Sequence, residues 1–240
     1  MYFYAKSSSM LRFILSLLCF SITGFAFGQL RISEAEILIQ SRHIWRGSQL
    51  GDAFAIEPTV TLEMGRFIFN FWAAVTPDNS YSEVDLIPSW TFDHFSLSLL
   101  NYYNPVSGDI NQYLNFREGK SRHSLELTID NFSVEKSRLK WMAGTFLAGD
   151  RNKETGKPFY STYLEFKYPF TILIIEAEPF VGLTPFQSFY ADRFAVINAG
   201  ISFSKELDLK LPFIVPLCLS FISNPNTQKN FIVFAVGIAF

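Results

Sequence analysis

The chain has 240 residues, a formal charge of −2 at pH 7 and 49% hydrophobic residues. This balance leaves no basic excess to release the counterions of a nucleic acid, so we expect no nucleic-acid partner. Aromatic residues make up 17% of the chain, with 27 Phe and 10 Tyr. Such an excess favours strands, and aromatic girdles line both rims of membrane β-barrels.

The N-terminus has the pattern of a secretory signal. Two bases precede an apolar run over 13–27, and Ala26-Phe27-Gly28 places small residues where a signal peptidase reads them. We expect residues 1–28 to be a signal peptide cleaved before Gln29, and 29–240 to be one domain. A membrane anchor is the less favoured alternative, because the run is shorter than the roughly 18 residues needed to span.

Cysteine and histidine are scarce. Cys19 would leave with the signal, so Cys218 would have no partner for a disulfide. The chain holds three His, and none stands at ligand spacing. We therefore expect no metal and no cofactor.

Three successive segments after residue 32 alternate between apolar and polar residues, at 33–48, 53–64 and 67–76. In the third, Phe67 and Phe69 fall on one face and Asn70 on the other. Side chains alternate with period two along a strand, so this pattern is typical of a membrane barrel. A soluble sandwich would alternate too, so the connections must decide.

Nine further strands are predicted, at 81–93, 95–103, 121–129, 139–149, 159–168, 172–184, 194–204, 211–222 and 230–240. Short and long connections alternate between them, as in outer-membrane barrels with short periplasmic turns and longer outer loops. Twelve strands would leave both mature termini in the periplasm. Ten or fourteen stay open, because 139–149 and 172–184 alternate poorly. Prolines inside the predicted strands count against a barrel, since each removes a ladder donor: Pro58, Pro88, Pro179, Pro212 and Pro216.

The segment from Ser41 to Pro105 resembles a porin-like family of Gram-negative outer-membrane proteins. That family opens on an S-x-Y-x-W/F-R-G strand, a short Gly/Asp loop and a P-T/S strand. His43 stands where an aromatic is usual, and the matching residues here are Ser41, Trp45, Arg46, Gly47, Gly51, Asp52, Pro58 and Thr59. The resemblance implies an outer-membrane barrel with a channel role, and it brings no catalytic residues.

The last stretch, 231–240, reads FIVFAVGIAF and ends on Phe240. Large apolar residues alternate there with small ones, which indicates a crowded interior behind a lipid-facing surface. A terminal Phe on such a strand resembles the assembly signature of outer-membrane barrels. That resemblance implies outer-membrane lipid and the barrel assembly machinery as partners. We therefore predict an all-β, transmembrane, antiparallel up-and-down barrel of about 12 strands.

The predicted inward faces carry charged residues that could line a pore. A small channel for ions or solutes would use them for selection, whereas paired charges could instead neutralise one another inside a narrow barrel. We expect the first strand to place two Arg near the outer mouth, opposed by carboxylates of the second and fourth strands. The pore-lining candidates are Arg42, Arg46, Glu57, Glu83, Asp85, Arg122, Glu126, Glu165 and Lys167.

Two other functions stay open. A non-conducting structural barrel could be plugged by lumenal Trp72, Ile87 and Ile222. An outer-membrane lipid hydrolase could use His94 and Ser96, whose i, i+2 spacing puts a base near a nucleophile. His94 falls at a predicted periplasmic turn, away from the outer leaflet, so we do not expect an enzyme.

Overall fold

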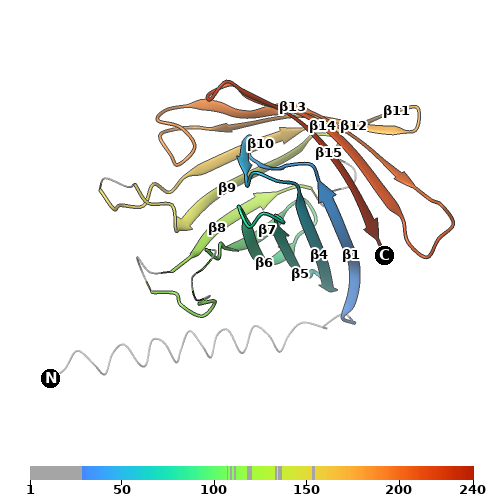
Figure 1. Cartoon of the computed structure of the whole chain (residues 1–240), viewed down its shortest axis with the longest axis horizontal. Coiled ribbons are helices and arrows are strands. Elements are labelled where there is room, and N and C mark those ends of the chain that lie inside the picture. The colour runs from blue at the N-terminus through green and yellow to red at the C-terminus, as the bar shows by residue number, and fades with distance from the viewer. Residues whose placement is uncertain are drawn as a thin grey trace.

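The structure is a computed structural model, and it describes residues 29–240 except 107, 109, 111, 118–120, 133, 135–136 and 153–154. Its described strands form a closed antiparallel barrel of twelve, in which each strand pairs with its neighbours in chain order and β1 pairs with β15 (Figure 1). The wall strands are β1 (Arg31–Gln40), β4 (Ala55–Met64), β5 (Phe67–Val75), β6 (Ser82–Thr91), β7 (Ser96–Tyr103), β8 (His123–Asp130), β9 (Lys140–Ala148), β10 (Thr162–Lys167), β12 (Ile175–Thr184), β13 (Ala195–Leu207), β14 (Val215–Asn224) and β15 (Lys229–Ala239).

The predicted fold class and the count of twelve are confirmed, and most predicted strands lie within a few residues of the observed ones. The wall alternates as expected. On β15, Ile232 and Phe234 are 65% and 51% exposed, whereas Val233 and Ala235 between and beside them are buried. These outward side chains are large and apolar, so the barrel has a hydrophobic outer surface. Among the described residues, no helix is long and apolar enough to cross a membrane.

The two ends of the barrel differ. The pairing of Glu36 with Ala239 puts the start of β1 and the end of β15 at one end, which we call the terminal end. Short connections such as 65–66 and 92–95 lie there, together with a short strand, β11 (Phe170–Ile172), that pairs with β12. The opposite end carries the connections 41–54, 104–122 and 149–161. We call it the hairpin end.

The prediction of one long first strand over 33–48 is wrong. β1 ends at Gln40, and the chain then forms a separate two-stranded sheet of β2 (His43–Trp45) and β3 (Ser48–Leu50), which we call the inward hairpin. Arg46 and Gly47 have φ angles of 47° and 74°, as the two central residues of a type I′ turn require. The alternation did not reveal the break, because the hairpin is itself extended chain.

Ser41 fixes the point at which the chain leaves the wall. Its N–H donates to Phe234 O at 2.8 Å, and its hydroxyl oxygen accepts from Phe234 N–H at 3.0 Å. Beyond this point β15 pairs only with β14, through register pairs as far as Asn224 with Lys229. The inward hairpin is therefore anchored to the wall at its base.

The prolines did not prevent closure. Pro58, Pro88, Pro179 and Pro216 all lie inside wall strands, and Pro212 lies in the connection before β14. A closed barrel has no edge to accommodate them, so each position gives up one ladder donor. The expected signal peptide over 1–28 lies outside the described residues.

Candidate functional site in the barrel lumen

The inward hairpin lies inside the lumen rather than above it. His43 is 6% exposed, and its ring lies 5.4 Å from the rings of both Trp72 and Tyr81. Its Nδ1 is 2.8 Å from Glu57 Oε1 on β4. The start of the hairpin is thus held against the β4–β6 side of the wall.

The tip of the hairpin reaches the other side of the barrel. Asn224 Nδ2 on β14 donates to Gly47 O at 3.1 Å. A Cβ on Gly47 would lie 1.9 Å from Ile197 O on β13, so only glycine allows this approach. The hairpin therefore crosses the lumen from one wall to the other.

A buried ion pair holds the tip. The Arg46 guanidinium donates from Nη1 and Nη2 to the two carboxylate oxygens of Glu126 on β8, each at 2.8 Å. The side chains are 8% and 0% exposed. Tyr102 donates its hydroxyl to the same carboxylate at 2.6 Å, and Arg46 also donates to the Tyr190 hydroxyl. Such a bidentate ion pair, with two parallel hydrogen bonds, is stronger than a pair of neutral hydrogen-bonding groups.

Glycine on the neighbouring strand makes room for this pair. A Cβ on Gly144 of β9 would lie 2.4 Å from Glu126 Oε1. Any larger residue there would displace the carboxylate that Arg46 binds. The position of the carboxylate is therefore set by β9 as well as by β8.

Aromatic rings surround the guanidinium. Its carbon lies 4.7 Å from the Trp45 ring centre and 4.4 Å from that of Tyr163. Trp45 also contacts the rings of Tyr102 and Tyr190, at centroid distances of 6.0 and 5.8 Å. Burial raises the pKa of the Tyr190 hydroxyl above its ordinary value, so this hydroxyl stays neutral beside the ion pair. Burial opposes the charge of Arg46, but Tyr190 and Glu126 outweigh it and raise the pKa of Arg46 above its usual range.

Arg42 and Arg46, which we expected on the first strand, do not lie there. Arg42 is exposed and donates to Gln49 at 3.1 Å, whereas Arg46 is buried in the lumen. The carboxylate that faces Arg46 is Glu126, not the expected Glu57, Glu83 or Asp85, because the turn at 46–47 carries the side chain across the barrel.

The three other carboxylates near the hairpin lie inside the barrel with different partners. Glu57 accepts from Gln40 Nε2 at 2.6 Å as well as facing His43. Glu83 accepts from the Tyr81 hydroxyl. Asp85 is buried, and its Oδ1 meets no donor among the described residues.

The remaining candidates lie on the β8–β12 side. Glu165 and Lys167 share the inner face of β10, with Lys167 Nζ 3.5 Å from Glu165 Oε1 and 3.2 Å from Glu178 Oε1. Glu165 also accepts from the Tyr163 hydroxyl and from Asn198 Nδ2, the latter at 3.1 Å. Arg122 is half-buried just before β8, at the hairpin end.

Small hydroxyl residues form part of the lumen lining between the middle of the wall and the terminal end. Ser89 donates to Ser98 at 2.7 Å, and the hydroxyls of Ser202 and Ser220 lie 2.8 Å apart. These pairs join neighbouring strands and reach only a short way into the lumen. The free Cys218 lies on the same face of β14 as Ser220.

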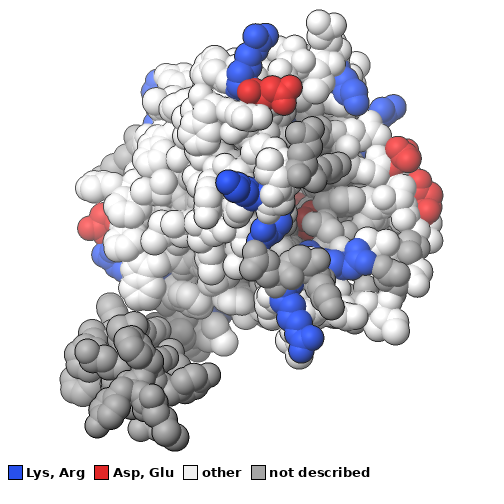
Figure 2. All heavy atoms as spheres, turned by 90° about the vertical axis from the view of Figure 1, so that its left-hand side faces the viewer, with Lys and Arg blue, Asp and Glu red and all other residues white. Residues whose placement is uncertain are grey.

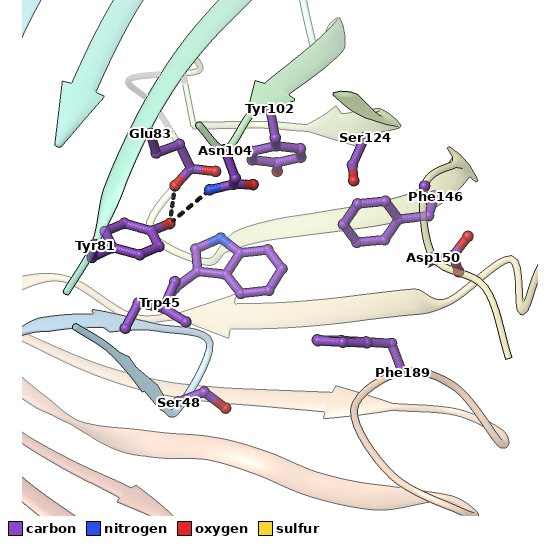
Figure 3. A pocket seen from close by; sticks show the side chains of 12 residues that line it. Trp45, Ser48, Tyr81, Glu83, Tyr102, Asn104, Ser124, Phe146, Asp150 and Phe189 are labelled. Atoms are coloured by element: carbon purple, nitrogen blue, oxygen red, sulfur yellow. Dashed lines mark hydrogen bonds between the residues drawn. The ribbon is translucent and has the colours of Figure 1, made fainter. Parts of the chain in front are cut away.

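A cavity of about 280 Å³ lies beside the inward hairpin, toward the hairpin end (Figure 3). Five aromatic rings and two carboxylates line it, and they come from the hairpin, β6, β7, β9 and the connections after β5, β9 and β12. Its lining residues are Trp45, Ser48, Leu50, Tyr81, Glu83, Tyr102, Asn104, Ser124, Phe146, Gly149, Asp150 and Phe189.

The two residues considered for a lipid hydrolase differ in exposure. His94 is exposed at the turn between β6 and β7, while Ser96 is buried, 3.4 Å from the Thr91 hydroxyl. Among the described residues, no three His, Cys, Asp or Glu side chains are grouped so as to hold a metal ion.

The sequence analysis did not predict the aromatic rings that surround Arg46, and it did not single out Asp150. Trp45 and Arg46 were singled out as part of a strand, but nothing local shows that a strand folds inward. The available signal was Arg46-Gly47, because a glycine after a polar residue is typical of a two-residue hairpin turn.

A closed antiparallel barrel with an apolar outer wall and a polar lumen defines the class of membrane β-barrels, so the fold indicates a membrane location. No family model matches the chain, and no curated protein matches it. Solved structures do match. One comes from work described as "Unveiling the Mechanism Behind the in-meso Crystallization of Membrane Proteins", with a TM-score of 0.50 and 9% identity, over 88% of this chain and 83% of that one. At that identity the likeness shows the shared fold alone.

Proposed function

We propose that the protein is an outer-membrane barrel that passes small solutes or ions, with a preference for cations, through a lumen constricted by the inward hairpin. The observation that carries the proposal is the sign of the lumenal charge. Buried carboxylates face inward from several strands, including Glu57, Asp85 and Glu165, whereas Arg46 pairs with Glu126 and Lys167 with Glu165 and Glu178. Acidic linings are typical of cation-preferring pores.

The location in the outer membrane is part of this proposal. The terminal end would face the periplasm, so that both mature termini lie there and the longer connections face outward. The final strand would be read by the barrel assembly machinery. Phe240 suits that role because it is 72% exposed, at the end of an apolar outward face.

A non-conducting structural barrel is the second candidate, and the Arg46–Glu126 pair favours it. Buried pairs brace the lumen at the point where a solute would pass. On this view the hairpin is a permanent plug, and the carboxylates serve to position it and the wall.

Conductance of the purified, folded protein in planar bilayers tests the proposal. We expect small currents. In a salt gradient, we expect the sign of the reversal potential to show that cations pass more readily than anions. Absence of current through both the wild type and Arg46→Ala would favour the structural barrel. Assay of the same sample for lipid hydrolysis tests the enzyme alternative, for which we expect no activity.

A further inference from the structure

The cavity beside the inward hairpin is lined by a buried carboxylate, one oxygen of which has no hydrogen-bond donor among the described residues. Asp150 is 5% exposed. Its Oδ2 accepts from Ser161 N–H at 2.7 Å, but its Oδ1 meets no donor among the described residues. A buried acceptor without a donor is costly, so the position favours a ligand that brings an N–H or O–H.

The walls around this carboxylate are aromatic. Phe146 and Phe189 lie beside Asp150, and Trp45 lies between them and Tyr81 (Figure 3). On the far side of the cavity, Tyr81 donates to Glu83 and accepts from Asn104 at 3.4 Å. Two carboxylates and several aromatic rings thus line the same cavity.

No Lys or Arg is among the residues that line the cavity. Arg46, which follows the lining residue Trp45, has its charge met by Glu126. The lining therefore combines unmatched negative charge with ring faces, and ring faces attract cations. An anionic ligand would meet no positively charged side chain among these lining residues.

We propose that the cavity binds a protonated primary or secondary amine with an apolar body about the size of one aromatic ring. The ammonium would donate to the Asp150 carboxylate, and the apolar body would lie against Trp45, Phe146 and Phe189. The volume of about 280 Å³ lies near the lower end of the usual range for ligand pockets, which fits a compact molecule.

The rim of the hairpin end is basic, so the selectivity comes from contacts inside the cavity. Figure 2 looks onto this end and shows Lys and Arg side chains around a hollow, with acidic atoms within it and some Asp and Glu side chains farther out. Exposed bases of these connections include Arg42, Arg117, Arg151 and Arg193. They do not steer a cation inward, so we expect modest affinity with strong discrimination between ligands.

The biological role of this site rests on the proposed function, because in a channel an amine site in the lumen would select which solute passes. Its test does not require current. Isothermal titration of the folded protein in detergent would use phenethylammonium, with neutral 2-phenylethanol and anionic 3-phenylpropionate as matched probes. We expect the ammonium to bind about tenfold or more tightly than the alcohol, and the carboxylate not at all. The trimethylated ammonium, which keeps the charge but lacks N–H, should bind more weakly than the primary amine.

Asp150→Asn should lower the affinity for phenethylammonium about tenfold and leave that for the alcohol unchanged. Asp192→Asn is the control, because it removes the same charge from an exposed position in the neighbouring connection. Phe189→Ala should weaken binding of both the ammonium and the alcohol. Phe189 is 64% exposed, so this variant does not depend on the fold tolerating a buried change.

Equal affinity for the ammonium and the alcohol, or equal loss in the Asp150 and Asp192 variants, would overturn the amine site. Binding without current would support the site and contradict the channel. Current that millimolar phenethylammonium does not block, with no binding in titration, would contradict the site and support the channel. Heat-dependent gel migration confirms that each variant is folded before it is titrated.

Discussion

The lumen of this barrel has two halves that are built differently. Near the hairpin end it is filled by the inward hairpin, whose Arg46 is enclosed by rings and bonded to Glu126. Toward the terminal end its lining comes from the wall strands and includes the hydroxyl pair of Ser202 and Ser220 and the ion pair of Lys167 with Glu178. The comparison shows that the hairpin half is filled by a segment that leaves the wall, whereas the terminal half is lined by side chains of the wall strands themselves.

The largest expected effect comes from breaking the buried ion pair. Arg46→Ala would leave the Glu126 carboxylate buried and unpaired, at a cost of about 3–5 kcal/mol in the free energy of unfolding. Urea unfolding of the protein in lipid vesicles, followed by tryptophan fluorescence, would measure it.

The matched control is Arg66→Ala. Arg66 and Asp93 form an exposed pair at 2.7 Å in the turns of the terminal end, so its loss should cost about 1 kcal/mol or less. Similar losses for the two variants would mean that the Arg46–Glu126 pair contributes no more than a surface pair.

The wall itself should be intolerant of charge on its outer face. Phe234→Arg places a cation at the middle of β15, where the native side chain is half exposed on the apolar surface. We expect a loss of about 2–4 kcal/mol in the same unfolding experiment.

Gln228→Arg introduces the same residue in the exposed connection before β15 and should change stability by about 0.5 kcal/mol or less. A substitution on the inner face of the same strand, Gly237→Ala, is less suitable as a control, because the added Cβ would lie 2.9 Å from Ile37 O. If Arg is tolerated equally at 234 and 228, the outer face of β15 does not meet lipid.

Cys218 can report whether the hairpin separates the two halves. It lies six residues before Asn224 on one face of β14, about 20 Å along the strand from the contact with the hairpin tip. A cationic methanethiosulfonate reagent added outside whole cells should label Cys218 slowly in the wild type. Arg46→Ala should raise the rate about tenfold or more, because the hairpin is no longer pinned.

Glu57→Gln offers a comparison for that experiment, since it weakens the base of the hairpin at His43 and leaves the Arg46 pair intact. Its effect on labelling should be smaller. Equal rates in the wild type and in Arg46→Ala would show that the hairpin does not block the path to Cys218.

The wall and the hairpin also differ in how far the sequence predicts them. The wall strands could be predicted from period-two alternation together with the connections, because large apolar residues such as Ile232 and Phe234 recur at every second position on the outer face. The hairpin could not be predicted in the same way. The partner of Arg46 lies 80 residues along the chain, and its position depends on the absence of a side chain at Gly144. Nothing near Asp150 indicates that one of its oxygens would be left without a donor.

The smallest expected effect concerns charge in the terminal half. Lys167 lies 3.2 Å from Glu178 and 3.5 Å from Glu165, so Lys167→Ala would leave two carboxylates unmatched on the inner face of the wall. The hairpin would stay in place, because the contacts of Lys167 within the described chain are with Glu165, Glu178 and the ring of Phe132 and not with the hairpin. We expect a small shift of the reversal potential toward the cation value in a salt gradient, and the shift should fade as ionic strength rises and the Debye length falls. Lys157→Ala, in an exposed connection at the hairpin end, is the control and should leave the potential unchanged. If Lys167→Ala also leaves it unchanged while Arg46→Ala alters it, selectivity is set in the hairpin half alone and the terminal half is a passive vestibule.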